Sequence, residues 1–324
     1  MKFEVFDSGF IYTEASFPSA HASTIEEMEN GNLIAAWFGG THERHPDVSI
    51  YTSVKTEAGW SSPKKVADGF ENDTLSYPTW NPVLFNVQNK LFLFYKIGPS
   101  PSTWWGAYKI SKDRGETWSD KKLLPKGILG PIKNKPIQLE NGRIVSPSSV
   151  ELQDGEVWHA HMEISDDLGE TWRIVPVNQD SDYKVIQPTI VQLKNGDLKA
   201  FFRSDQDVIL ESFSKDDGAT WSDFSRSELA NPNSGIDAVG LKNGGFLMVY
   251  NPLASGEAWW EGRSKLYLAY SNDAEHWQDV LQLENKEEGE FSYPAIMQTK
   301  NGEIHITYTY DREKIKYFRL KRTN

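Results

Sequence analysis

Several strand-like segments of this 324-residue chain begin with side chains that could take part in chemistry. His21 and Tyr293, near the two ends of the chain, can both transfer protons in an enzyme. Other strand starts carry amide, amine or carboxylate groups: Asn81, residues 133–135, Gln187 and Asp237. Polar residues are also expected wherever a β-channel opens to water, so each of these positions is either functional or a hydrogen-bonded channel residue.

A short loop between two predicted strands is dense in ionisable groups. Residues 41–47 (THERHPD) follow Gly39 and Gly40, where the backbone could approach a ligand closely. We expect Arg44 to contact substrate. A solvated surface loop is the alternative.

Three polar residues alternate with apolar ones in the segment 157–164. In an extended strand, His159, His161 and Glu163 lie on one face. They could bind a metal or a substrate, but we favour a hydrogen-bonded polar row and predict no metal and no other cofactor.

Two tryptophan pairs lie in long connections between predicted strands, at 104–105 and 259–260. Exposed aromatic rings of this kind can stack on a sugar, or they can pack between sheets. We expect Trp105 to contact the substrate.

One internal repeat predicts the elements that must position these residues. A serine, a short acidic turn and a tryptophan recur about every fifty residues, at 53–60, 111–118, 165–172, 214–221 and 271–277. The serine ends a strand, Asp or Asn closes a turn, glycine adopts a conformation that other residues avoid, and the tryptophan packs between sheets. Calcium binding is disfavoured because a distal glutamate ligand is absent.

A second repeat supplies hairpin turns. Asn-Gly dipeptides join apolar, strand-like runs at 30–31, 141–142, 195–196, 243–244 and 301–302, and Gln88-Asn89 fills the gap. Six hairpins, each followed by an outer segment, predict an all-β fold, a six-bladed β-propeller. The first and last hairpins lie at the chain ends, so we expect the terminal segments to close the ring.

Composition agrees with a single propeller domain over residues 1–324. Hydrophobic residues make up 38% and aromatic residues 13% of the chain, enough for a large core, and no linker-like tract divides it. The net charge of −12 argues against nucleic acid as a partner. No segment resembles a signal peptide or a membrane span, which predicts a cytoplasmic protein, or a secreted one if a leader has been removed.

With these motifs, the chain resembles the sialidase superfamily of glycoside hydrolases over nearly its whole length. Its tryptophan boxes are similar to sialidase Asp-boxes, which also occur in non-enzymatic propellers. Sialidases hold the substrate carboxylate with three arginines, because planar guanidinium groups bind a carboxylate bidentately. The resemblance places two of these arginines at Arg203 and Arg263, while His21 stands where the remaining one is expected.

The resemblance also implies catalytic roles. Asp47 corresponds in placement to the acid/base aspartate, and Tyr293 to a nucleophilic tyrosine, which departs from the usual pair of carboxylates. The family activates this tyrosine with a glutamate, but Gln187 occupies that place and cannot accept a proton. His21 and Gln187 therefore predict a reshaped pocket, lined also by Asn81 and Asp237.

These features predict an exo-acting glycoside hydrolase that removes an acidic terminal sugar from a carbohydrate. Two alternatives remain open. One is a uronate lyase on the same scaffold, with His21 or Tyr293 as the base. The other is a propeller that binds carbohydrate without turnover. The sequence predicts no oligomeric state.

Overall fold

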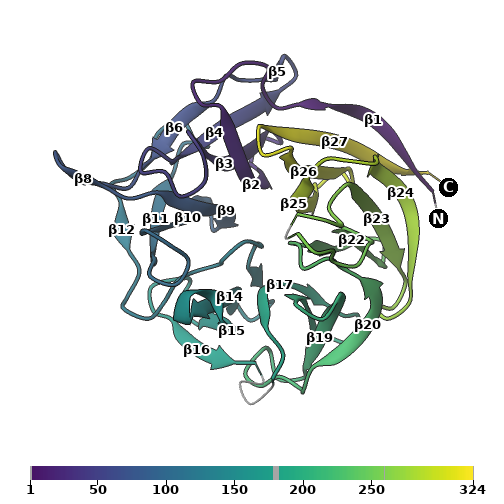
Figure 1. The fold of residues 1–324 in the computed structure, drawn as a ribbon. Helices are drawn as coiled ribbons and strands as arrows, with labels where there is room; N and C mark the ends of the chain where they lie inside the picture. The colour runs from purple at the N-terminus through teal and green to yellow at the C-terminus, as the bar shows by residue number, and fades with distance from the viewer. Residues whose placement is uncertain (1, 178–181, 259, 324) are drawn as a thin grey trace.

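Six antiparallel sheets surround a central axis in the computed structural model, which describes residues 2–177, 182–258 and 260–323. Five of the sheets have four strands and one has five. Figure 1 looks along the axis, with one sheet forming each blade of the ring. The predicted all-β, six-bladed propeller is confirmed.

Each blade runs from an inner strand at the channel to an outer strand at the rim. The inner strands are β2 (Ser19–Glu27), β9 (Thr79–Val87), β13 (Ile137–Gln138), β17 (Val185–Gln192), β21 (Asp237–Gly240) and β25 (Phe291–Gln298). The second strands are β3 (Leu33–Gly40), β10 (Lys90–Ile97), β14 (Ile144–Leu152), β18 (Leu198–Ser204), β22 (Phe246–Tyr250) and β26 (Ile304–Tyr310). The third strands are β4 (Ser49–Thr56), β11 (Trp105–Ser111), β15 (Val157–Ser165), β19 (Val208–Ser214), β23 (Lys265–Ser271) and β27 (Lys314–Thr323).

The outer strands are β5 (Gly59–Trp60) with β6 (Lys64–Ala67), then β12 (Lys122–Leu123), β16 (Arg173–Pro176), β20 (Ser225–Ala230), β24 (Trp277–Asn285) and β1 (Lys2–Phe10). A small hairpin, β7 (Phe70–Asn72) with β8 (Leu75–Ser76), stands outside the blades, and η1 (Gln153–Gly155) is a single 3-10 turn. In the part of the chain that the structure describes, no helix is long and apolar enough to cross a membrane.

The two ends of the chain close the ring, as predicted. Strand β1 pairs antiparallel with β27, from Lys2 opposite Thr323 to Phe10 opposite Lys316. The sixth blade therefore combines the first strand of the chain with its last three, and both termini lie at its rim (Figure 1).

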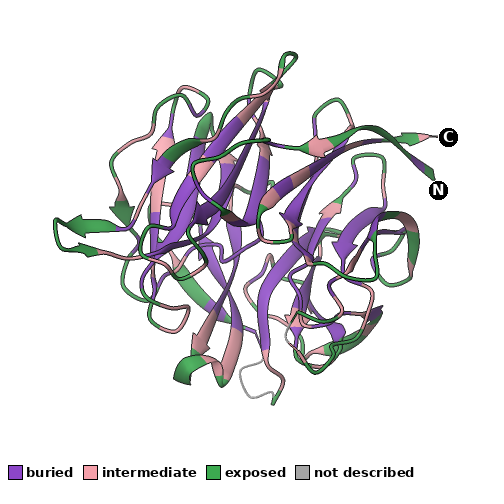
Figure 2. Ribbon diagram, turned by 45° about the horizontal axis from the view of Figure 1, so that its top comes forward, coloured by how far each residue is buried: buried purple, intermediate pink, exposed green. Residues whose placement is uncertain are grey.

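The core lies between neighbouring blades. Both faces of the middle strands are covered, so that β3 is buried along its whole length (Figure 2). Ile34 and Ile50 of the first blade pack in one cluster with Leu84 and Leu93 of the second. Such strands read as continuous apolar runs because neither face meets water.

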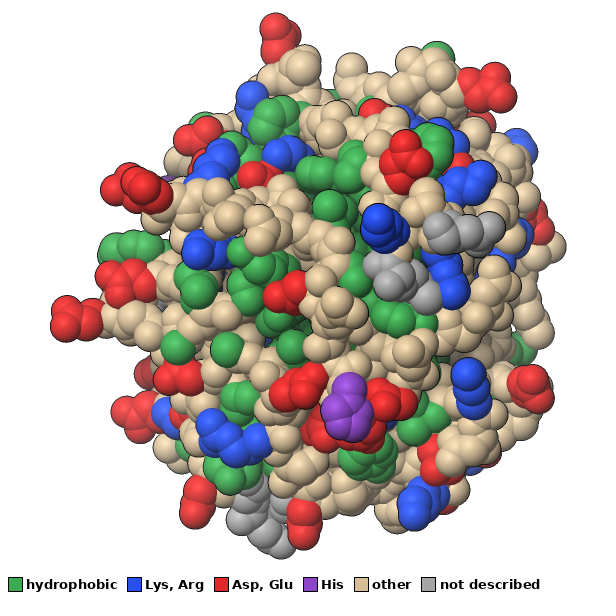
Figure 3. Space-filling model, turned by 90° about the vertical axis from the view of Figure 1, so that its right-hand side faces the viewer, with side chains coloured by type: hydrophobic (Ala, Val, Ile, Leu, Met, Phe, Trp, Pro, Cys, Tyr) green, Lys and Arg blue, Asp and Glu red, His purple; other side chains and the backbone are tan. Residues whose placement is uncertain are grey.

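The outer surface is mixed in charge. On the flank shown in Figure 3, acidic side chains gather around a histidine, in keeping with the net charge of −12. At the last tryptophan box (271–277), Asp273 raises the pKa of the exposed His276 through a hydrogen bond and through its charge. The charges of Glu228 and Glu275 add to this effect.

The tryptophan boxes are turns held by their own side chains. In the fourth blade, the Ser214 hydroxyl donates to Asp216 Oδ1 at 2.9 Å and accepts the Gly218 N–H at 2.8 Å. Asp216 in turn accepts the Thr220 N–H at 2.8 Å and the Thr220 hydroxyl at 2.6 Å. Gly218 has φ +81°, which a residue with a Cβ rarely adopts, and Trp221 packs against the core. The scaffolding role predicted for the boxes is confirmed.

We predict that Ser214→Ala lowers the free energy of unfolding by about 1–3 kcal/mol, because the substitution removes both hydrogen bonds of the buried Ser214 hydroxyl. Urea unfolding followed by tryptophan fluorescence measures the change. Ser62→Ala, at an exposed serine, is the control and should be close to neutral. Equal stability of the two variants would remove the argument for the box as a structural turn.

Candidate active site

Four inner strands carry a β-bulge near the mouth of the channel, and each bulge has a residue with positive φ. These residues are Ala22 (φ 56°), Asn81 (φ 30°), Gln187 (φ 54°) and Tyr293 (φ 51°). A proline, which has no N–H for the ladder, follows three of them. Positive φ is uncommon for non-glycine residues, and bulges re-aim side chains beside active sites. The backbone at these strand starts is therefore shaped to place particular side chains.

The Tyr293 hydroxyl lies at the centre of the site. It accepts hydrogen bonds from Arg203 Nη1 at 2.8 Å and from Gln187 Nε2 at 3.2 Å. Arg203 Nη1 also donates to Gln187 Oε1 at 3.2 Å, and Arg203 Nε donates to Asn233 Oδ1 at 2.7 Å. Both of these contacts to the tyrosine oxygen come from donors, an arrangement that stabilises negative charge on that oxygen.

The His21 ring packs against this tyrosine at an angle of 52°. The two ring centroids are 4.2 Å apart, and only 2% of the histidine is exposed. Burial lowers the pKa of His21 well below 6.5, and the charges of Arg312, Arg263, Arg203 and Lys133 lower it further. Among the described residues, its buried Nδ1 has no hydrogen-bond partner. His21 is therefore a neutral imidazole that can accept a proton from a bound molecule.

This depressed pKa predicts a dependence of stability on pH. Folded His21 stays neutral as the pH falls through 6.5, whereas the unfolded chain takes up a proton there. The unfolded state then binds more protons, so the free energy of unfolding decreases as the solution is acidified. Urea unfolding between about pH 7.5 and 5.5 should show a weaker dependence in His21→Gln. His305, whose pKa burial lowers to about 4, contributes in the same direction and stays in place as an internal reference. An unchanged slope in His21→Gln would show that His21 titrates normally.

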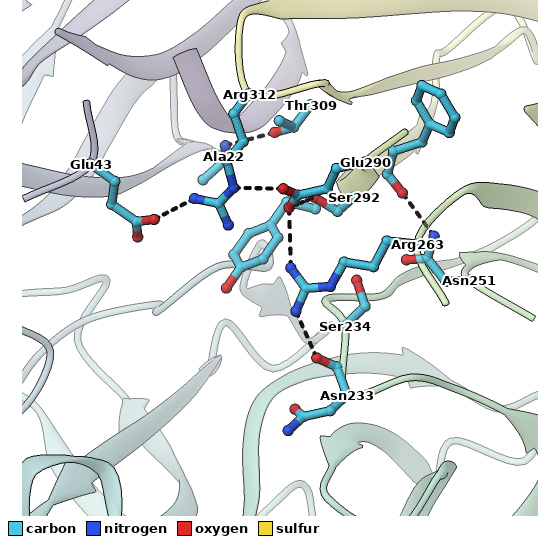
Figure 4. A network of polar contacts seen from close by, with 12 residues as sticks. Ala22, Glu43, Asn233, Ser234, Asn251, Arg263, Glu290, Ser292, Thr309 and Arg312 are labelled. Carbon is cyan, nitrogen blue, oxygen red and sulfur yellow. Dashed lines mark hydrogen bonds and ion pairs between the residues drawn. The ribbon is translucent and has the colours of Figure 1, made fainter. Parts of the chain in front are cut away.

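An ion-pair network behind Tyr293 joins two further arginines (Figure 4). Glu290 accepts from Arg263 Nη1 at 3.1 Å and from Arg312 Nε at 2.7 Å. Arg312 also pairs with Glu43 from the loop 41–47, and Arg263 Nη2 donates to the Asn233 carbonyl at 3.0 Å. Burial alone would raise the pKa of Glu290, but Arg312 and then Arg263 outweigh it, so that its pKa lies below the usual value.

Three members of this network were not expected from the sequence: Arg312, Glu290 and Glu43. Arg312 lies in the turn between β26 and β27, with φ 54°. This turn and the loop 41–47 both connect the second strand of a blade to the third, so blade geometry places them at the same mouth of the channel. The equivalent position of these two loops in their blades is the feature of the sequence that could have identified Arg312 as a site residue.

The predicted acid/base residue, Asp47, lies in the exposed loop 41–47. Its carboxylate accepts the Thr41 N–H at 3.0 Å and the Thr41 hydroxyl at 2.6 Å, and lies 2.8 Å from His45 Nδ1. Partial burial raises the pKa of Asp47, but the hydrogen bonds from Thr41 and His45 outweigh it and lower the net value. Asp47 is therefore ionised near neutral pH, and its role as an acid remains a prediction.

Arg44 is exposed in the same loop, with φ 77°. Burial raises the pKa of Glu151 in the third blade, and the charges of Arg203 and Arg44 act against that rise. Trp158, also in the third blade, lies with its ring centroid 5.6 Å from the Arg203 guanidinium. A contact with substrate remains a prediction.

The other predicted pocket residues have different surroundings. Asn81 is buried at its bulge in β9. Asp237 is buried deeper in the channel, where it pairs with Lys135 at 2.8 Å and accepts the Thr189 hydroxyl at 2.8 Å and the Ile296 N–H at 2.9 Å. It ties four blades together.

Trp105 is the first residue of β11, at the end of the connection in which it was expected. The Trp105 ring packs edge-on against Tyr77, with centroids 5.3 Å apart. Trp260 is 53% exposed, and Trp259 lies outside the described residues. Sugar contact by Trp105 stays a prediction.

The row on β15 forms internal hydrogen bonds. His161 Nε2 lies 3.3 Å from Glu163 Oε1, and Glu163 accepts the N–H groups of Leu129 and Gly130 at 2.7 Å each. His159 is only partly buried. Within residues 2–177, 182–258 and 260–323, no group of three or more His, Cys, Asp or Glu side chains could hold a metal ion. The favoured interpretation, a polar row, is confirmed for His161 and Glu163.

Comparison with known proteins places this geometry in context. Residues 31–306 match the model of the BNR repeat-like domain. The anhydrosialidase of Macrobdella decora is 30% identical over 154 residues, which are 43% of this chain and 19% of that protein. The chain thus matches about a fifth of the length of that curated relative.

Solved structures share the fold at low identity. A Dyadobacter fermentans protein of unknown function superimposes with a TM-score of 0.79 at 17% identity, covering 99% of each chain. The intramolecular trans-sialidase of Ruminococcus gnavus, solved with oseltamivir carboxylate, gives a TM-score of 0.74 at 17% identity over 97% of each chain. The family match covers most of the sequence, and the chain therefore belongs to the BNR repeat-like domain family of sialidase-like six-bladed β-propellers.

Proposed function

We propose that the protein is a glycosidase that acts on the acidic terminal sugar of a carbohydrate. The observation that carries this proposal is the convergence of three arginines from three blades around Tyr293 and His21. Arg203 bonds to the tyrosine oxygen, and the charges of Arg203, Arg263 and Arg312 all act on His21. Guanidinium groups in such a buried cluster suit a carboxylate better than a neutral sugar.

In the hydrolytic mechanism, the arginines hold the carboxylate and Tyr293 faces the anomeric carbon. Negative charge on the tyrosine oxygen, supported by Arg203, stabilises the positive charge that develops as the glycosidic bond breaks. Asp47 would protonate the leaving oxygen and then activate water. A sugar bound over the loop 41–47 would exclude water from Asp47 and raise its pKa, as an acid role requires.

Elimination is a second candidate, and the neutral His21 beside Tyr293 specifically favours it. His21 would take the proton from the carbon α to the carboxylate, and the electron pair would form a carbon–carbon double bond. The bond between C4 of the uronate and the glycosidic oxygen on that carbon, which lies β to the carboxylate, would break, and Tyr293 would protonate the departing oxygen. Arginines on the carboxylate would make the α proton more acidic by stabilising the intermediate negative charge.

One experiment separates these reactions. Sialosides and uronate-terminated oligosaccharides are incubated with the protein in heavy-oxygen water, and the products are followed by mass spectrometry and ultraviolet absorbance. A saturated sugar carrying heavy oxygen supports hydrolysis. A sugar lighter by one water with ultraviolet absorbance supports elimination, and the same mass without absorbance supports an intramolecular transfer.

The control is a Tyr293→Phe, Arg203→Gln double variant, which reports any contaminating glycosidase. Saturable sugar binding without any product would overturn the enzymatic proposal and favour a carbohydrate-binding propeller.

A further inference from the structure

The segment 133–135 crosses from the third blade to the inner strands β17, β21 and β25 of the next three blades, where it makes side-chain contacts. The inner strand of the third blade, β13, has only two residues, and the chain before it runs into the channel instead of pairing in the blade. We infer that Lys133 and Asn134 are positioning residues that hold the bulges of Tyr293 and Gln187. This inference rests on the proposed function for its catalytic meaning.

Lys133 supports the bulge of Tyr293. Its Nζ donates to Asn134 Oδ1 at 2.8 Å, to the Ile236 carbonyl at 2.8 Å and to the carbonyl of Pro294, the residue after Tyr293. Burial lowers the pKa of Lys133 to about 7, and the charge of Asp237 acts against that fall. The three acceptors match the three protons of the ammonium form, whereas a neutral amine would leave one acceptor without a donor. Only 4% of Lys133 is exposed, so water cannot replace these contacts.

The side chain of Lys133 and the ring of Tyr293 both lie beside Gly235. A Cβ placed on Gly235 would lie 3.2 Å from Lys133 Cε and 3.5 Å from the Tyr293 ring. The glycine thus leaves the space that the lysine and the tyrosine occupy. A larger residue at position 235 would crowd both side chains.

Asn134 supports the bulge of Gln187 in the same way. Its Nδ2 donates to the Gln187 carbonyl at 3.1 Å and to the Pro188 carbonyl at 2.9 Å. A residue before proline in a left-handed bulge loses regular ladder bonds, and its buried carbonyl needs another donor. Lys133 and Asn134 therefore each support one bulge. The side chains of these two bulges contact each other, because Gln187 Nε2 donates to the Tyr293 hydroxyl.

The crossing segment is itself fixed to the second and third blades. Lys96 donates to the Pro131 carbonyl, and the Ile132 N–H donates to the Pro147 carbonyl at 3.2 Å. Glu163 holds the preceding turn through Leu129 and Gly130. Because this segment is held by two other blades, Lys133 and Asn134 can fix the positions of the Tyr293 and Gln187 bulges.

The test replaces Lys133 by methionine and follows Tyr293 directly. The ring signal of Tyr293 in a protein with labelled tyrosines is assigned by its loss in Tyr293→Phe. We expect Lys133→Met to shift this signal and to lower kcat about 10- to 100-fold with a much smaller change in KM, because small displacements of a catalytic group have effects of this size.

The matched control is Lys199→Met. Lys199 is also fully buried, but it pairs with Glu211 and Glu275 at 2.9 and 2.8 Å. The Lys199→Met variant should have a lower thermal stability, but its Tyr293 signal and its kcat should be unchanged.

An unmoved Tyr293 signal in folded Lys133→Met would overturn the inference. If that variant does not fold, Asn134→Ala carries the same test, since displacement of Gln187 must also shift the tyrosine signal. If the wild-type protein turns over none of the substrates, the proposed function fails. The shift of the Tyr293 signal in Lys133→Met still tests the positioning role, because it does not depend on turnover.

Discussion

Replacing Tyr293 by phenylalanine is expected to reduce the turnover of an acidic glycoside about 1,000-fold, within the range for losing a group that transfers protons or stabilises charge. The substitution removes one oxygen that accepts from Arg203 at 2.8 Å and from Gln187 at 3.2 Å. The ring stays, and with it the packing against His21, at 4.2 Å between the ring centroids. Binding of the substrate carboxylate by the arginines should persist, so the loss falls on kcat rather than on KM.

Steady-state kinetics on the substrate found by product analysis measures this loss. Tyr310→Phe is the matched control, because its hydroxyl lies on the neighbouring strand β26 and accepts from Lys286 rather than from the site. The control should retain nearly full activity. A Tyr293→Phe protein that keeps a tenth or more of the wild-type kcat, at about the same KM, would exclude the tyrosine oxygen from both the hydrolytic and the eliminative mechanism.

The sequence predicted the parts of this molecule that depend on local chemistry. The tryptophan boxes and Asn-Gly turns indicated six blades, because each turn is held by contacts within a few residues, as Ser214 and Asp216 show. Tyr293 and Gln187 could be grouped for a related reason, since inner strands of one propeller begin at a common mouth, whereas Arg203, near the end of the second strand β18, was assigned through the sialidase resemblance.

The rest of the site depends on contacts between distant segments, and no local pattern predicted them. Arg312 meets Glu290 and Glu43, which are 22 and 269 residues away along the chain. Lys133 reaches Pro294, 161 residues away. A long charged side chain finds such partners only after the blades have closed, so its residue type alone does not show whether it faces the site or water.

Replacing Arg312 by glutamine is expected to weaken binding of a carboxylate-bearing sugar about 30- to 100-fold, the size of one lost hydrogen bond to a charged group. The effect has two causes. The carboxylate loses one guanidinium, and Glu290, freed from Arg312, competes with the ligand for Arg263, to which it already lies 3.1 Å away. The variant should also be less stable, because the largely buried carboxylate of Glu290 has lost one of its two arginine partners.

Isothermal titration with the acidic sugar and with its neutral methyl ester identifies which interaction is lost. Arg319→Gln is the matched control: Arg319 lies within β27, farther along the chain from the turn that holds Arg312, and pairs with Glu303. If Arg312 recognises the carboxylate, Arg312→Gln weakens the acid and leaves the weak binding of the ester unchanged, while Arg319→Gln affects neither. An equal loss for acid and ester would mean that Arg312 shapes the mouth through Glu43 and Glu290, and that Arg203 and Arg263 alone recognise the charge.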